Sequence, residues 1–127
     1  MQYVNHETLL THSDCMAAQT LLAICQAEMI HLQKLGELIV LLGGKLDFKA
    51  RKNNCGKNWT PAPIALVYDF NEIIMANIKG ERAAIKQYED HIRLIKDSYI
   101  TDMLKRIVKD EKYHILLLKD LLKNECN

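Results

Sequence analysis

Hydrophobic residues along this chain recur at steps of three and four positions, which is the period of an α-helix with one buried face. The clearest series are Leu21, Ile24, Leu35, Leu38 and Leu42 in the first half, and Ile100, Met103, Ile107, Leu118 and Leu121 in the second. A third series includes Ile74, Ile78, Ile85, Ile92 and Ile95. The pattern therefore predicts an all-α protein.

Capping residues and glycines divide the pattern into four predicted helices. The expected ranges are Met1 to Leu10, Ser13 or Asp14 to about Leu42, Asp69 to Ile95, and Asp97 or Ser98 to about Lys123. Gly43 and Gly44 end the second helix. A connection of roughly twenty residues between the second and third helices usually travels the length of a bundle. We expect an antiparallel four-helix bundle with one long crossover and a short first helix.

Composition narrows the range of partners. The 127 residues predict one domain, 1–127, and the net charge of +1 gives no electrostatic case for nucleic acid or membrane partners. The apolar runs fall short of the ~20 residues that span a bilayer. The basic stretch Lys45 to Lys57 is interpreted as a solvated loop, and the four cysteines form no C-x-x-C metal motif. We expect a reducing, cytoplasmic location.

Two copies of Glu-x-x-His lie within the apolar stripes, one on the second predicted helix and one on the fourth. They are Glu28 with His31, and Glu111 with His114. The spacing places carboxylate and imidazole on one helix face, pointing where the hydrophobic residues point. An unpaired buried carboxylate is costly, and a metal ion would compensate its charge.

Glu81 is the only acidic residue in the inner stripe of the third predicted helix. Two-metal sites in four-helix bundles use one Glu from each of two helices and Glu-x-x-His from each of the other two. The sequence therefore predicts five metal ligands: Glu28, His31, Glu81, Glu111 and His114. The alternative is a set of buried polar residues that hydrogen-bond one another without a metal. Two histidines would then have to satisfy three carboxylates, which is a poor electrostatic balance.

A sixth ligand is missing from the first predicted helix. The two halves resemble copies of one helical hairpin, and by this repeat the partner of Glu81 falls upstream of Met1. Glu7 lies about 16 Å along the axis from the required level, so neither it nor His6 is expected to reach the site. The carboxylate is absent from this chain unless another subunit or a bound anion supplies it.

The remaining candidates are weaker. Tyr3 and Tyr88 are predicted to be core tyrosines with a satisfied hydroxyl, and a hydrogen bond to a metal ligand is the alternative. The run Glu89-Asp90-His91 leaves the apolar stripe and is interpreted as a solvated face, and His12 is expected to be exposed.

These residues resemble the ferritin-like di-iron superfamily, in particular its bacterioferritin and rubrerythrin branch. The similarity lies in Glu28-Met-Ile-His-Leu, in Lys109-Asp-Glu-Lys-Tyr-His114-Ile, and in the spacing from Glu81 to Tyr88. Gln2-Tyr3 in the first helix resembles the end of that Glu81 to Tyr88 segment. It covers nearly the whole chain apart from the crossover, with the first helix truncated. The resemblance implies that Glu28 and Glu111 bridge two metals. It also implies that His31 and His114 bind one metal each and that Glu81 is a terminal ligand.

The resemblance implies a non-haem di-iron oxidoreductase that reacts with oxygen or peroxide, of ferroxidase or peroxidase type. Iron is the favoured metal, and a manganese catalase-like protein is the alternative because carboxylate-rich sites accept manganese. A different class remains open: a non-catalytic interaction or structural module with a degenerate metal site. A short first helix exposes apolar surface on its neighbours, so we expect a homodimer or higher homo-oligomer.

Overall fold

The computed structural model describes residues 1–11, 13–46, 49–52, 55–58 and 67–124. Within these ranges it contains four α-helices and one short hairpin of two strands. The helices are α1 (Gln2–Leu10), α2 (Cys15–Leu41), α3 (Phe70–Leu94) and α4 (Ser98–Asn124), and the strands are β1 (Lys49–Lys52) and β2 (Cys55–Asn58). The predicted all-α bundle with a short first helix is confirmed.

Short polar side chains begin the three long helices, as the sequence predicts. The carboxylate of Asp14 accepts a hydrogen bond from the Ala17 amide at 2.9 Å, and Asp69 and Asp97 do the same at the starts of α3 and α4. Each bond satisfies one of the amide groups that a first helical turn leaves unpaired.

Two glycines end α2. Gly43 has a φ of 77°, a left-handed conformation that favours glycine, and its amide bonds to the carbonyl of Val40 at 3.0 Å. The amide of Gly44 bonds to the carbonyl of Ile39 at 2.8 Å, which completes a Schellman motif.

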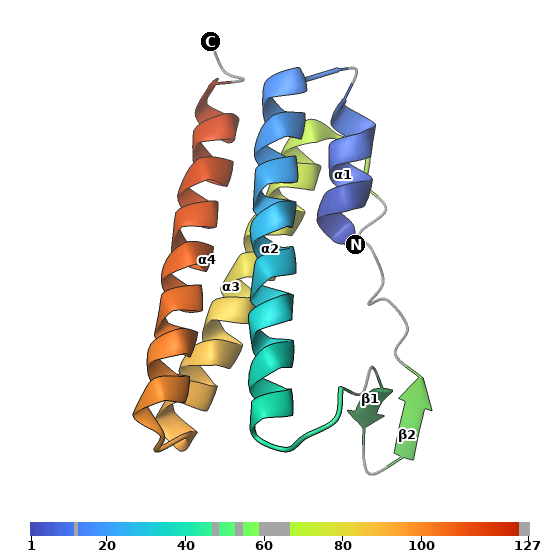
Figure 1. The fold of residues 1–127 in the computed structure, drawn as a ribbon. Helices are drawn as coiled ribbons and strands as arrows, with labels where there is room; N and C mark the ends of the chain where they lie inside the picture. The colour runs from blue at the N-terminus through green and yellow to red at the C-terminus, as the bar shows by residue number, and fades with distance from the viewer. Residues whose placement is uncertain (12, 47–48, 53–54, 59–66, 125–127) are drawn as a thin grey trace.

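The helices form two antiparallel hairpins, α1–α2 and α3–α4, which pack against each other through α1 with α3 and α2 with α4 (Figure 1). The end of α2 and the start of α3 lie at opposite ends of the bundle (Figure 1), as expected for a long crossover. The hairpin arrangement agrees with the internal repeat in the sequence.

The core is centred where all four helices overlap. Its fully buried residues include Leu21, Ile24, Ile73, Ile74 and Leu118. With 9 residues against 27, α1 is about 13 Å long and α2 about 40 Å, so α1 flanks only the first part of α2 (Figure 1).

The sequence was wrong about Leu42, which the periodicity placed in the buried stripe. Its side chain is 65% exposed because α2 ends at Leu41 and α1 does not extend to this level. The interpretation of Lys45 to Lys57 as a loop was also incomplete, because β1 and β2 pair there as antiparallel strands with Lys49 opposite Asn58.

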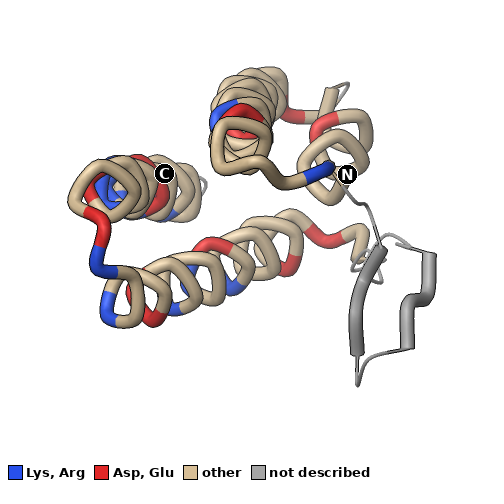
Figure 2. The backbone as a smooth tube through the Cα atoms, turned by 60° about the horizontal axis from the view of Figure 1, so that its bottom comes forward, with Lys and Arg blue, Asp and Glu red and all other residues tan. Residues whose placement is uncertain are grey.

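Charged residues are spread along the helices, with acidic and basic positions interspersed (Figure 2). This agrees with the near-zero net charge. By length and composition alone α2 is apolar enough to cross a membrane, a test that core helices of bundles also pass.

Candidate metal centre

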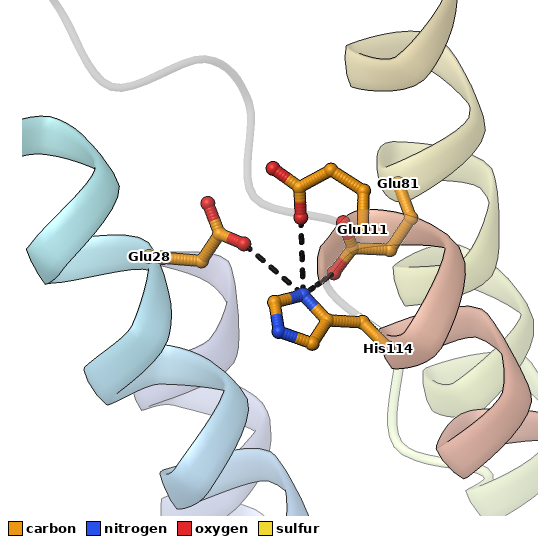
Figure 3. A group of neighbouring side chains, drawn as sticks. All are labelled: Glu28, Glu81, Glu111 and His114. Atoms are coloured by element: carbon orange, nitrogen blue, oxygen red, sulfur yellow. Dashed lines mark ion pairs between the residues drawn. The ribbon is translucent and has the colours of Figure 1, made fainter. Parts of the chain in front are cut away.

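Three helices bring the five predicted ligands together at the centre of the bundle. Glu28 and His31 come from α2, Glu81 from α3, and Glu111 and His114 from α4. One ligand atom from each of Glu28, Glu81, Glu111 and His114 lies within 4.8 Å of the other three, and the side chains point toward one another (Figure 3).

The Nδ1 atom of His114 is the centre of this group. It lies 3.0 Å from Oε2 of Glu111, 3.3 Å from Oε1 of Glu28 and 3.5 Å from Oε1 of Glu81 (Figure 3). One ring nitrogen carries at most one proton and cannot satisfy three oxygens.

Several of these buried atoms have no hydrogen-bond partner in the described part of the chain. They are Oε1 of Glu28, both carboxylate oxygens of Glu111, and Nδ1 of His31 and of His114. Buried polar atoms are normally hydrogen-bonded, and a cluster of orphaned oxygen and nitrogen donors fits a cation. The donor set therefore fits a metal ion.

His31 faces the same cluster from α2. Its Nδ1 lies 3.3 Å from Oε1 of Glu111 and 3.8 Å from Oε1 of Glu28. The rings of His31 and His114 are stacked, with centroids 6.1 Å apart. Both imidazoles thus direct Nδ1 toward the carboxylates.

Asp110 is a residue of the site that the sequence analysis missed. Its Oδ2 lies 3.3 Å from Nε2 of His31, and its Oδ1 lies 3.3 Å from Nε of Arg106. A carboxylate behind a ligating imidazole fixes the tautomer, because it accepts the proton of the nitrogen that does not bind metal. The only signal in the sequence is that Asp110 precedes Glu111. The corresponding residue of α2 is Ala27.

The carboxylates and histidines strongly change one another's pKa. The carboxylate of Glu111, 3.3 Å from Nδ1, is the largest cause that raises the pKa of His31, to about 10. Burial lowers the pKa of His114, but Glu111, Glu28 and Glu81 outweigh it and raise that pKa to about 11.

The two buried carboxyl groups respond in opposite directions. Burial disfavours the ionised form of Glu111, but the two histidines hold its pKa well below the usual range. Burial is the main cause that raises the pKa of Glu81. Without a cation, protonated imidazoles balance the carboxylates, and a bound cation has to displace those protons.

Tyr3 joins the site from α1, because its hydroxyl donates a hydrogen bond to Oε1 of Glu81. Burial and the Glu81 charge raise the pKa of Tyr3 far above its ordinary value, so the phenol keeps its proton. Tyr88 is half-buried, and burial raises its pKa to about 12. For Tyr3 the alternative is therefore found, because its hydroxyl bonds to the predicted ligand Glu81.

The remaining candidates lie elsewhere. His6 is fully buried against Asn77 at a Nδ1–Nδ2 distance of 3.0 Å, and Glu7 contacts the hydroxyl groups of Thr8 and Thr11. Lys112 forms an ion pair with Glu89, and Lys86 forms one with Asp90. His12 lies outside the described residues.

A pocket of about 380 Å³ opens onto the carboxylates of Glu28 and Glu81. Tyr3, Cys25 and Asn77 are among its lining residues. The candidate metal centre is therefore open to a small molecule on the side of α1.

Comparison with protein families gives one result for this chain. The family model of the ferritin-like domain matches residues 17–125. This range covers α3, α4 and all but the first two residues of α2, with all five predicted ligands, and leaves out α1. No curated protein matches the chain.

Proposed function

The chain belongs to the ferritin-like family, and we propose that it is a non-haem di-iron carboxylate protein. The observation that carries this proposal is the convergence of Glu28, Glu81, Glu111 and His114 within 4.8 Å. The unpaired oxygen and nitrogen atoms of Glu28, Glu111 and His114 match the ligands that iron and manganese accept.

The distances support different roles for the carboxylates. Glu28 lies 3.3 Å from His114 and 3.8 Å from His31, and Glu111 lies 3.0 Å and 3.3 Å from the same two rings. Both therefore suit the role of bridging two cations. Glu81 lies 3.5 Å from His114 and suits a terminal role beside that ring.

The two cation positions are unequal in this proposal. The position beside His114 has Glu81 and both bridging carboxylates, whereas the position beside His31 has only the bridging carboxylates. A first cation would bind more tightly beside His114, because Glu81, Glu28 and Glu111 would all hold it there.

Bound iron would supply electron transfer to oxygen or peroxide, and we propose an oxidoreductase of ferroxidase or peroxidase type. The chain supplies the ligand geometry, the pocket that admits a small molecule, and the Tyr3 hydroxyl that orients Glu81. Cys15 and Cys25 are free thiols, in accord with a cytoplasmic location.

The first test measures the metal content of protein purified without chelator from cells supplied with iron and manganese. We expect one tightly held metal per chain and a second that is lost more easily. Glu81→Gln removes a terminal ligand and should lower occupancy of the tight position, whereas Glu89→Gln on the same helix should not. Protein without stoichiometric metal would overturn the proposal and favour a structural module.

Manganese is the second candidate because the donor set is mainly carboxylate oxygen. A manganese catalase-like protein disproportionates peroxide without an added reductant, whereas a peroxidase requires one. Peroxide turnover by the manganese-loaded and iron-loaded protein, with and without reductant, separates these activities.

A further inference from the structure

Asn77 is a buried polar residue of α3 that contributes no ligand to the proposed metal centre. Its side chain is 1% exposed and lies one helical turn from the predicted ligand Glu81. Its Oδ1 accepts a hydrogen bond from Nε2 of Gln2 at 2.8 Å, and its Nδ2 lies 3.0 Å from Nδ1 of His6. Gln2 and His6 both belong to α1. Asn77 therefore ties two successive turns of α1 to α3.

These polar contacts hold a helix that has little apolar surface to fix it. Of the nine residues of α1, only His6 and Leu10 are buried. Apolar contact is not directional, so the apolar residues of α1 do little to prevent the helix from turning or sliding. Hydrogen bonds are directional, and a buried polar group that loses its partner is costly. Asn77 is therefore suited to set the register of α1 along α3.

The register of α1 decides which of its side chains meets the metal centre. Tyr3 follows Gln2 directly, and its hydroxyl donates a hydrogen bond to Oε1 of Glu81. A slip of α1 by one turn, about 5.4 Å, would carry the phenol out of reach of Glu81. The same slip would separate Asn77 from Gln2 and His6. The contacts of Asn77 and of Glu81 with α1 thus require the same register.

We propose that Asn77 is a positioning residue for the metal centre, because it holds α1 in the register that places Tyr3 on Glu81. This inference rests on the proposed metal-binding function, in which Glu81 is a ligand only of the cation beside His114. A hydrogen bond to a ligating carboxylate fixes its orientation. When α1 leaves this register, the Glu81 carboxylate rotates freely and binds that cation less well. The cation beside His31 is unaffected.

The first measurement needs no metal. In the metal-free protein the Tyr3 hydroxyl proton is bonded to a buried carboxylate, so it should exchange slowly and give its own nuclear magnetic resonance signal. Tyr3→Phe identifies this signal by its loss. Asn77→Leu keeps a side chain of similar volume but removes both contacts with α1, so the signal should disappear. Gln2→Met removes one contact at a half-buried position and should speed the exchange.

Calorimetric titration with Mn²⁺ tests the effect on the metal centre. Tyr3→Phe should lower affinity for the first cation about 10- to 100-fold, the usual effect of losing a hydrogen bond to a ligand. Asn77→Leu should lower it by a similar factor. The double variant should fall no further than Tyr3→Phe, because Asn77 acts through Tyr3. Affinity for the second cation, beside His31, should hardly change in any of them.

Thr101→Val is the matched control. Thr101 is 9% exposed, and its hydroxyl donates a hydrogen bond to the Ser98 carbonyl at 3.1 Å in the first turn of α4. The variant loses this bond without touching α1, so it should keep the Tyr3 signal and both affinities. Circular dichroism shows whether each variant has formed its helices, and Gln2→Met replaces Asn77→Leu if the latter does not fold.

Three results would overturn the proposal. They are a Tyr3 signal that persists in folded Asn77→Leu, an equal loss of affinity at both cation steps, and a double variant that binds the first cation more weakly than Tyr3→Phe. Unaltered protein that binds no metal overturns the proposed function instead. The Tyr3 signal then decides by itself whether Asn77 positions Tyr3.

Discussion

His114 shows at the scale of one residue why this bundle centre is suited to a cation. Three carboxylate oxygens lie between 3.0 and 3.5 Å from one ring nitrogen, and that nitrogen has no satisfactory hydrogen bond. Without a compensating cation these groups would destabilise the core, because burying each carboxylate costs free energy. The spacing of Glu111 and His114 was visible in the sequence, whereas the contacts with Glu28 and Glu81 required the fold.

Asp110 gives the first prediction at this scale. Asp110→Asn keeps the shape of the side chain but removes the charge that holds the Nε2 proton of His31. We expect affinity for the second cation to fall about 10- to 100-fold, the usual effect of losing such a partner. Affinity for the first cation, beside His114, should hardly change. Calorimetric titration with Mn²⁺ measures both steps.

Asp102→Asn is the control for this variant, because Asp102 lies on the same helix and pairs with Lys105 at the surface. It should bind both cations as the unaltered protein does. An equal loss at both steps in Asp110→Asn, or no loss at either, would show that Asp110 does not act through His31.

At the scale of helices, local sequence signals were sufficient to predict where the three long helices begin and where α2 ends. The starts of α2, α3 and α4 follow from Asp14, Asp69 and Asp97, because a short acceptor side chain satisfies an amide within three residues of itself. The end of α2 follows from Gly43, which adopts a left-handed φ. None of these interactions depends on another helix.

Asp69→Ala should lower the free energy of unfolding by about 1 kcal/mol, because it removes the acceptor for the Glu72 amide. Asp69→Asn keeps a capping oxygen and should cost much less. Chemical denaturation followed by circular dichroism measures both. Metal stoichiometry should stay unchanged in either variant, and a large loss of metal in Asp69→Ala would show that this cap also positions the site.

Periodicity was a poorer guide to burial within helices. Leu42 continues the apolar stripe of α2 yet is exposed, whereas Leu21 in the same stripe is fully buried. The difference arises because α1 lies beside the first part of α2 and does not extend to the level of Leu42 (Figure 1). The hydrophobic pattern of one helix carries no information about the length of the helix packed against it.

At the scale of the whole molecule, the buried cluster links stability to pH. Without metal, the pKa values of His31 and His114 rise from 6.5 to about 10 and about 11. A raised pKa in the folded state stabilises the protein fully below the unfolded pKa, and this stability is lost as pH rises through the folded pKa.

We therefore expect the Tm of the metal-free protein to fall as pH rises from about 6.5 to about 10. Metal binding needs neutral imidazoles, so the increase in Tm on adding Mn²⁺ should grow over the same range. Differential scanning calorimetry with chelator and with Mn²⁺ measures both trends. His114→Gln should weaken the dependence, and the exposed His91→Gln should not; a Tm without pH dependence in all forms would contradict this account.

The sequence by itself determined the helices, their caps and the inward direction of the five predicted ligands, because these depend on contacts within a few residues of the chain. Only the tertiary structure decided which side chains meet. It brought Tyr3 to Glu81 and Asp110 to His31, each across more than seventy positions of the chain. It also left the end of α2 uncovered, because the packing of α1 against α2 is a property of the assembled bundle.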